Sequence, residues 1–193
     1  MGSSTSRDAP AQLSNAQIAT GFLDESIGAM HGLQSALDAQ AFDRAVLMLA
    51  RADAIWLLGS RRLFPIAAYL DHAFRHTDKR VGLITGLGGM QEGEARSIRR
   101  DDVLVAISSA PHAPELLTIV DDARARGAGL IAISDTRLGR SPGPAECHLM
   151  VQDSSRFGFR SLAGTMALAQ CLFAALAYRL GLGAAPAGPE TRS

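Results

Sequence analysis

The sequence predicts an α/β fold of three layers, in which helices cover both faces of a five-stranded parallel sheet. Short apolar runs of strand length recur along the chain, and a segment with helical spacing follows most of them. These runs do not alternate with polar residues, as expected for strands that are buried on both faces and joined by crossover helices. The composition agrees, because 47% of the residues are apolar, only 5% are aromatic and 19 are glycine. Such a mixture suits helices that pack closely on a sheet.

The expected elements follow one another regularly along the chain. Five runs are predicted as strands, over residues 54–58, 80–85, 103–107, 129–133 and 147–151. Apolar residues spaced three and four apart predict helices after four of them, over residues 64–76, 90–98, 114–126 and 159–181. The fourth strand leads instead into an irregular segment.

Two more helices, over 16–38 and 42–51, are predicted before the first strand, and polar segments at 1–14 and 184–193 are predicted as flexible tails. We therefore expect one domain over 15–183, with N-terminal helices over 16–51 and an α/β core over 52–183. The helices 16–38 and 159–181 carry more apolar surface than one sheet face covers. This surplus predicts that the chain pairs with itself, as a homodimer or a dimer of dimers.

The charge pattern argues against direct DNA binding by this chain. Basic and acidic residues balance at 19 each. A nucleic-acid-binding domain usually carries a basic stripe, whereas here the basic residues form only short pairs such as Arg61-Arg62 and Arg99-Arg100.

The cysteines and the apolar segments predict a reduced, cytoplasmic protein without metal or cofactor. Cys147 and Cys171 lie far apart and lack the spacing of a metal site or a disulfide framework. Residues 1–10 lack the apolar core of a secretory signal. The apolar stretch 162–182 contains Gln170 and Arg179, which are costly in lipid, so we interpret it as a buried helix and expect no membrane partner.

Polar loops at the ends of the predicted strands are the candidate ligand site. In an open parallel sheet the binding crevice lies outside the carboxyl ends of the strands, where helix N-termini also point and favour anions. Four segments occupy such positions, namely residues 59–62, 108–115, 134–136 and 152–156. Their serines and arginines suit an anionic ligand such as phosphate. Gly, Ser, Asp and Pro also serve turns and helix caps, so no single loop is specific.

The order and spacing of these segments resemble the SIS (sugar isomerase) domain, and most closely the effector domain of RpiR/MurR-type bacterial transcription regulators. The resemblance covers about residues 38–181 and rests on the segments 52–59, 99–108 with the following Pro114-Glu115, 123–134 and 161–170. It implies the SIS fold and a sugar phosphate or related anionic metabolite as ligand.

Two loops depart from the family pattern. The first usually reads Gly-x-Gly-x-Ser, but here Ser60, Arg61 and Arg62 follow Gly59. The usual hydroxyl is missing, although a guanidinium could take its place as a bidentate phosphate partner. The second usually reads Ser-x-Ser-Gly-x-Thr-x-Glu, and only its Ser108 and Glu115 match.

Each replacement in the second loop removes a hydrogen-bond donor that would bind the anion. Ala110 and Ala113 lack hydroxyl donors, and Pro111 and Pro114 lack a backbone N–H. Proline in the first turn still favours a helix, so the helix should survive. The pocket therefore either binds a different anion or has become largely structural, and we favour the first.

The resulting prediction of ligand-binding residues contains nine positions: Gly59, Ser60, Arg61, Arg62, Ser108, Ser109, His112, Glu115 and Ser134. No metal ligands are predicted, since His72 and His76 share a helix face without further ligands nearby.

Three functions are compatible with this sequence. The favoured one is the ligand-sensing and dimerising domain of an RpiR-type regulator, whose helix-turn-helix has no room in residues 1–37, so that a DNA-reading domain was either removed or never present. The alternative is a sugar-phosphate aldose–ketose isomerase that uses Glu115 or His112 as base. Glu115 also suits the first turn of a helix, where a carboxylate complements the dipole, and the lost hydroxyls weigh against catalysis. The third is a degenerate module that serves only for oligomerisation.

Overall fold

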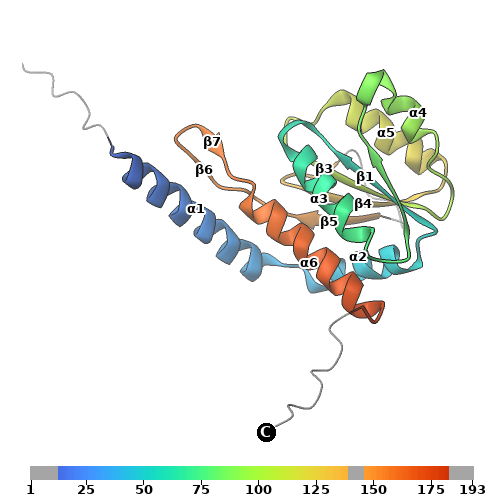
Figure 1. Cartoon of the computed structure of the whole chain (residues 1–193), viewed down its shortest axis with the longest axis horizontal. Coiled ribbons are helices and arrows are strands. Elements are labelled where there is room, and N and C mark those ends of the chain that lie inside the picture. The colour runs from blue at the N-terminus through green and yellow to red at the C-terminus, as the bar shows by residue number, and fades with distance from the viewer. Residues whose placement is uncertain (1–12, 139–145, 183–193) are drawn as a thin grey trace, which may run out of the picture.

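A computed structural model, which describes residues 13–138 and 146–182, confirms the parallel α/β architecture (Figure 1). The strands of its main sheet are β1 (Ala54–Gly59), β2 (Arg80–Ile84), β3 (Val103–Ser108), β4 (Gly129–Ser134) and β5 (Glu146–Met150). All neighbours pair in parallel, in the order β2-β1-β3-β4-β5. Every predicted strand is present, and its bounds agree with the sequence prediction to within one residue.

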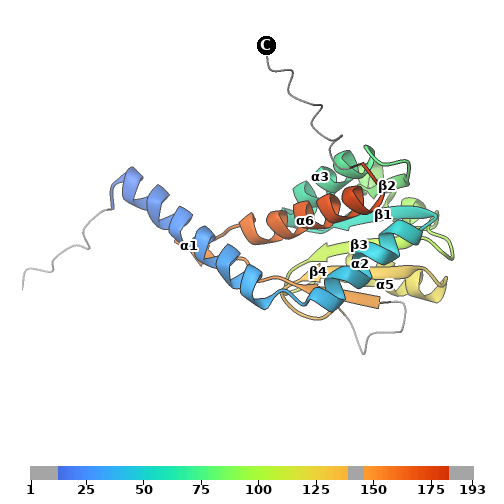
Figure 2. The ribbon, with the colours of Figure 1, turned by 90° about the horizontal axis from the view of Figure 1, so that it is seen from below.

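Helices cover both faces of this sheet. One face packs against α2 (Ala39–Arg51), α3 (Phe64–Phe74) and α6 (Ala163–Arg179), and the other against α4 (Gln91–Ala95) and α5 (Pro114–Ala125). Figures 1 and 2 show these helical layers on opposite sides of the strands. The three-layer prediction is therefore confirmed.

The central strands supply both cores, which explains their lack of polar alternation. In β3, Val103, Val105 and Ile107 face the core beneath α2, α3 and α6. Leu104 and Ala106 face the second core, beneath α4 and α5. Because both faces are covered, every residue of β3 is buried.

Helix α1 (Asn15–Ala36) extends away from the sheet, as Figure 2 shows. It begins with a capping box, in which the side chain of Ser14 accepts from the backbone N–H of Gln17 and the Gln17 side chain accepts in return. Among its residues only Gly21 and Ser26 are buried. The helix contacts the start of α6 and little of the core, so much of its apolar surface stays exposed.

The start of the last helix differs from the sequence prediction. The prediction that this helix starts at residue 159 is wrong, because α6 begins at Ala163. Residues 155–160 form a hairpin of β6 (Ser155–Arg156) and β7 (Phe159–Arg160). Phe159 and Arg160 pair instead with Arg156 and Ser155, across a turn in which Phe157 and Gly158 have φ angles of +55° and +80°. The tight turn they form reverses the chain before α6.

The predicted tails lie mostly outside the described residues, which leave out 1–12 and 183–193. Within the described part of the chain, no helix combines the length and the apolar character needed to cross a bilayer.

A buried carboxylate, that of Asp102, ties two strands together at the amino end of the sheet. Its Oδ2 accepts from Nε1 of Trp56 at 3.0 Å and from the backbone N–H of Arg99 at 2.8 Å. Gly82 on β2 leaves room for the Trp56 ring, because a Cβ there would lie 2.6 Å from it. The indole can therefore lie across β2 and reach Asp102.

We predict that Asp102→Ala lowers the free energy of unfolding by about 2–4 kcal/mol, because it leaves two donors without an acceptor. The control is Asp122→Ala on the exposed face of α5, which should change the same quantity by about 0.5 kcal/mol or less. Urea denaturation measures both, and equal effects would show that the Asp102 hydrogen bonds contribute nothing specific.

Candidate functional site

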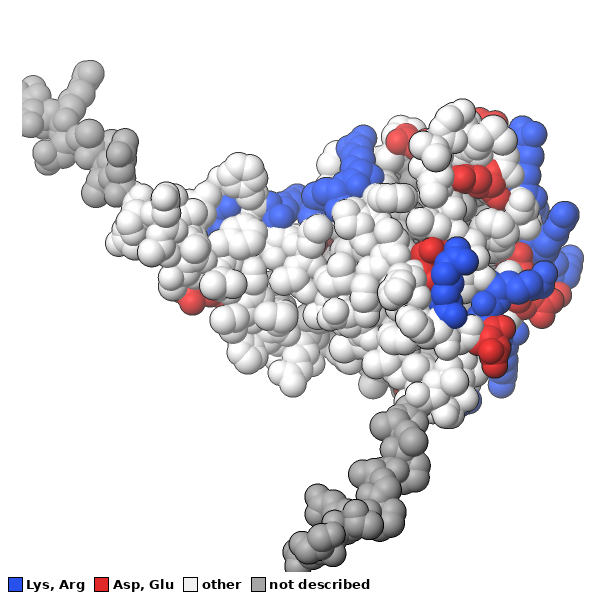
Figure 3. Space-filling view, in the orientation of Figure 1, with Lys and Arg blue, Asp and Glu red and all other residues white. Residues whose placement is uncertain are grey.

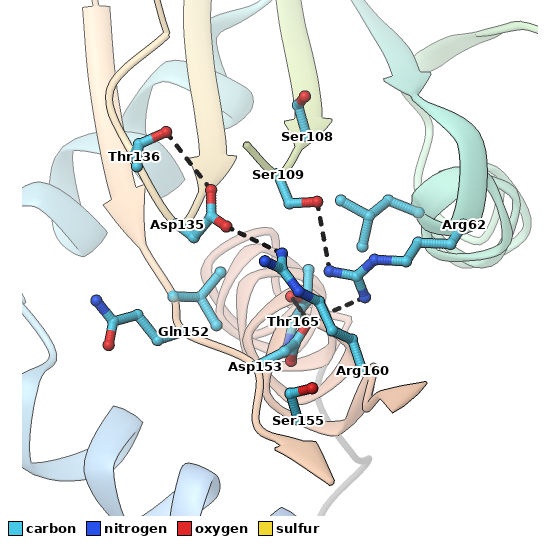
Figure 4. A pocket seen from close by; sticks show the side chains of 12 residues that line it. Arg62, Ser108, Ser109, Asp135, Thr136, Gln152, Asp153, Ser155, Arg160 and Thr165 are labelled. Atoms are coloured by element: carbon cyan, nitrogen blue, oxygen red, sulfur yellow. Dashed lines mark hydrogen bonds and ion pairs between the residues drawn. The ribbon is translucent and has the colours of Figure 1, made fainter. Parts of the chain in front are cut away.

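A polar pocket of about 320 Å³ lies outside the carboxyl ends of the strands, where the parallel sheet predicts a ligand site. It is bordered by the loops after β1, β3, β4 and β5, by the β6–β7 hairpin and by the start of α6 (Figure 4). The lining residues are Arg62, Leu63, Ser108, Ser109, Asp135, Thr136, Val151, Gln152, Asp153, Ser155, Arg160 and Thr165.

Arg62 enters the pocket from the short 3-10 helix η1 (Arg61–Leu63), which follows β1 directly. Gly59 permits this close turn, since a Cβ there would lie 2.8 Å from the carbonyl oxygen of Leu63. The Arg62 guanidinium donates to the carbonyl oxygen of Ser161 at 3.2 Å and to Oγ of Ser109 at 3.3 Å. Two loops distant in sequence thus hold it in place.

Asp153 forms the floor of the pocket, and its side chain is only 4% exposed. Its carboxylate accepts from the backbone N–H of Thr165 at 3.0 Å and from the Thr165 hydroxyl at 2.6 Å, in the first turn of α6. It also lies 3.9 Å from the Arg62 guanidinium. The helix N-terminus, the hydroxyl and the arginine together compensate this buried charge.

A second carboxylate, that of Asp135, directly follows β4 and faces the loop between β3 and α5. Its Oδ1 accepts from the backbone N–H of Ala110 at 2.8 Å. Its Oδ2 lies 3.5 Å from the guanidinium of Arg160. Asp135 therefore joins the β4 end, the β3–α5 loop and the hairpin.

The β6–β7 hairpin places Arg160 at the pocket and contacts α1. Arg156 at its other strand pairs with Glu25 of α1 at 3.1 Å, and both side chains are partly exposed. Gly21 of α1 makes room for this contact, because a Cβ there would lie 2.9 Å from Nε of Arg156.

A chain of hydroxyl and imidazole groups runs along one side of the pocket. Nδ1 of His112 lies 2.9 Å from Oγ of Ser108, and its Nε2 lies 2.8 Å from Oγ1 of Thr136. Ser108 also lies 3.4 Å from the hydroxyl of Ser60. Both ring nitrogens of His112 are thus engaged by hydroxyl groups.

Three of the nine residues predicted from sequence line the pocket, namely Arg62, Ser108 and Ser109. Ser60 and His112 do not line the pocket, but each lies within hydrogen-bonding distance of Ser108, which does. The others lie outside the lining. Gly59 shapes the turn after β1, Ser134 is buried and donates to the Thr136 carbonyl, Arg61 is exposed, and Glu115 is exposed in the first turn of α5.

The list of nine predicted residues leaves out Arg160, Thr165 and the two carboxylates, although the nominated segments 134–136 and 152–156 contain Asp135 and Asp153. Asp135 and Asp153 do follow predicted strands, so their position was a usable signal. Arg160 was hidden because residues 159–181 were predicted as one helix, and the hairpin was not foreseen.

The loop after β2 takes no part in this pocket. The carboxylate of Glu94 accepts from the backbone N–H of Thr85 at 2.8 Å and of Gly86 at 3.0 Å, and from the Thr85 hydroxyl at 2.8 Å. Burial acts to raise the pKa of Glu94, but these hydrogen bonds outweigh it and leave the pKa lowered. Glu94 of α4 thus holds the loop after β2 in place through hydrogen bonds within that segment.

The SIS domain model matches residues 48–178, which include all the strands of the described residues and every residue that lines the pocket. The chain belongs to the SIS domain family. This agrees with the resemblance drawn from the loop sequences. No curated protein matches the chain.

Solved structures with the same fold include regulators and an enzyme. The sugar isomerase domain of an RpiR transcription factor from Sphaerobacter thermophilus has a TM-score of 0.77 at 19% identity, over 86% of this chain and 93% of that one. The NanR protein of Vibrio vulnificus, complexed with ManNAc-6P, has a TM-score of 0.70 at 16% identity, over 86% and 64%. A phosphoheptose isomerase from Francisella tularensis has a TM-score of 0.72 at 14% identity, over 86% and 100%. At these identities the likeness shows the fold.

We predict that Thr165→Val lowers the free energy of unfolding by about 1–2 kcal/mol, because it removes a hydroxyl donor from the buried Asp153 carboxylate while keeping the side-chain shape. Thr118→Val is the matched control, since the exposed Thr118 hydroxyl donates only to a carbonyl of its own helix. The comparison uses chemical denaturation. A Thr165 effect no larger than the Thr118 effect would contradict the assigned role of this hydrogen bond.

Proposed function

We propose that this chain is a sugar-phosphate-sensing SIS domain of an RpiR-type transcription regulator. The observation that carries the proposal is the presence of two arginines, Arg62 and Arg160, in a polar pocket at the carboxyl ends of the strands. Guanidinium groups bind phosphate through paired N–H donors. The likeness to RpiR and NanR structures supports the regulatory part.

The size and lining of the pocket suit a single sugar phosphate. Its volume of about 320 Å³ lies at the small end of ligand pockets. Thr136, Gln152 and Ser155 offer hydrogen-bonding groups to sugar hydroxyls, whereas Leu63 and Val151 supply only small apolar patches. A polyol with one anionic group matches this lining better than an apolar molecule.

The pocket is connected to α1, which gives ligand binding a route to an output. Arg62 donates to the carbonyl of Ser161, and the hydroxyl of Ser161 lies 3.1 Å from that of Ser26 on α1. A ligand that draws Arg62 toward itself would change this junction. We propose that such a change alters the position of α1, while another domain contacts DNA.

Helix α1 is also the proposed homodimer surface. Leu23 is 61% exposed and Ile27 is 49% exposed, and Met30 and Leu37 are exposed nearby. Figure 3 shows few charges on the visible surface over α1 and α6, whereas Lys, Arg, Asp and Glu gather toward the opposite end. An apolar, uncharged surface of this kind suits a second copy of the chain.

A cytoplasmic location is proposed on the basis of the two cysteines. Cys147 and Cys171 are both free, and Cys147 is buried. A reducing compartment keeps such thiols unpaired.

An aldose–ketose isomerase is the second candidate, favoured by the position of His112 behind Ser108 and Thr136 at the pocket wall. We rank it lower because both ring nitrogens of His112 are already engaged, and because Glu115 lies outside the lining. Turnover of a bound sugar phosphate that is lost on His112→Asn or Glu115→Gln would reverse this ranking.

We predict that a thermal-shift screen of hexose, pentose, amino-sugar and nonulosonic acid phosphates, including ManNAc-6P, finds a stabilising ligand. Arg62→Ala should then weaken its binding by about tenfold or more, because charge-assisted hydrogen bonds to the phosphate are lost. Arg61→Ala is the control and should leave the affinity within about twofold, since Arg61 is exposed outside the lining. A screen without any stabilising ligand would favour a module that serves only for oligomerisation.

We predict that the chain is a homodimer at micromolar concentration and that the double variant Leu23→Glu, Ile27→Glu is a monomer. Charges on an interface that excludes water carry a large desolvation cost. Ser35→Glu on the polar side of α1 is the control and should remain dimeric. Light scattering gives the mass, and a monomeric wild type would remove the prediction.

A further inference from the structure

The loop that follows β3 has few donors left for an anion. Pro111 and Pro114 have no backbone N–H, and the N–H of Ala110 already donates to Oδ1 of Asp135 at 2.8 Å. A ligand oxyanion at Ala110 would have to displace a carboxylate of the protein. The Ala110 N–H in this loop is therefore already occupied by an anion that belongs to the chain.

The two carboxylates of the pocket are satisfied mainly by uncharged donors. Asp153 accepts twice from Thr165 at the N-terminus of α6, and Asp135 accepts from Ala110. Backbone N–H groups at a helix start stabilise negative charge without an arginine. The positive charges of Arg62 and Arg160 are thus only partly compensated by these two carboxylates.

The guanidinium groups keep donors for a ligand. Among the described residues, the contact of Arg160 is with Asp135 at 3.5 Å, and its side chain is 47% exposed. Arg62 is 32% exposed, and its carboxylate neighbour lies as far as 3.9 Å away. Figure 4 shows both guanidinium groups directed into the same pocket; Arg62 extends from η1 and Arg160 from the β6–β7 hairpin.

We propose that the anionic group of the ligand is bound by Arg62 and Arg160, between η1 and the hairpin, and that the β3–α5 loop is closed to it by Asp135. The proposal rests on the proposed function, since it assigns an orientation to the same sugar-phosphate ligand. The sugar then extends toward Thr136 and Gln152. The ligand class is a polyol with a terminal oxyanion that fits a pair of guanidinium forks, either a phosphate or a carboxylate.

The test follows the backbone amide and arginine Nε–H signals of the full chain by NMR during titration with inorganic phosphate and, separately, with ManNAc-6P. We expect the largest shifts at Arg62, Arg160 and the hairpin residues. The largest shifts at Ser109, Ala110 and His112 would overturn the proposal, because they would place the anion in the loop.

Matched arginine variants give the second readout. Arg160→Gln should weaken the binding of phosphate and of ManNAc-6P by about tenfold or more. Arg156→Gln in the same hairpin should change it by less than about twofold, because Arg156 pairs with Glu25 and does not line the pocket. Arg160→Lys should give an intermediate loss, since it keeps the charge without the fork.

The outcomes separate the two proposals. A wild-type chain that binds these probes, with Arg160→Gln binding them equally well, overturns the arginine site and leaves sugar-phosphate sensing standing. Binding of no oxyanion by the wild type overturns both. A carboxylate sugar that binds as tightly as its phosphate counterpart supports the guanidinium pair, whichever of the two the ligand carries.

Discussion

The buried carboxylate of Asp153 is the constraint around which the pocket is organised. With its side chain 4% exposed, the charge has to be met inside the protein. Thr165 meets it with a backbone N–H and a hydroxyl, and Arg62 approaches from the other side. The end of β5, the start of α6 and the turn after β1 are thereby fixed relative to one another. Removing one member would leave the remaining groups with unpaired polar atoms at low dielectric.

Ser161 connects the pocket to the N-terminal helix α1, because it contacts both Arg62 and Ser26. Its carbonyl accepts from Arg62, while its hydroxyl accepts from the backbone N–H of Ala163 and lies against Ser26 of α1. The contact of α1 with the core is small, and the second connection is the partly exposed pair of Arg156 and Glu25. Since only Gly21 and Ser26 of α1 are buried, little buried surface opposes a displacement of this helix. The same helix carries the proposed dimer surface, so a small change in the pocket would reach the partner copy.

The sheet could be predicted from sequence because burial on both faces leaves a clear pattern of apolar runs. Arg62, Ser108 and Ser109 could be found because the ends of parallel strands meet at one edge. Which of Arg61 and Arg62 points into the pocket could not be predicted, because it depends on the short helix η1 and on the φ angle of +50° at Arg61.

Other features of the site depend on tertiary structure alone. The bond from Ala110 to Asp135 requires β3 and β4 to pair with Ser108 opposite Ser134, which no local pattern shows. Arg160 was concealed because Phe159 fits the helical spacing of the residues that follow. The turn at Phe157 and Gly158, set by two positive φ angles, overrides that spacing.

In the proposed site, the loss of donors in the β3–α5 loop and the arginines across the pocket act in the same direction, because both favour an anion at the guanidinium groups. Backbone N–H groups of a loop bind an anion at a fixed place, because the helix that follows holds them rigidly. In the proposed site, guanidinium groups on η1 and on the hairpin would bind it instead, and ordering the 47% exposed Arg160 side chain would carry a larger entropic cost. That arrangement suits the proposed sensor, because a ligand that ordered Arg160 would compete with its 3.5 Å contact to Asp135 and could displace the hairpin. The hairpin leans on α1 through Arg156. In a rigid loop the energy of anion binding would stay local, whereas in the proposed site part of it would be applied to the element that carries the proposed dimer surface.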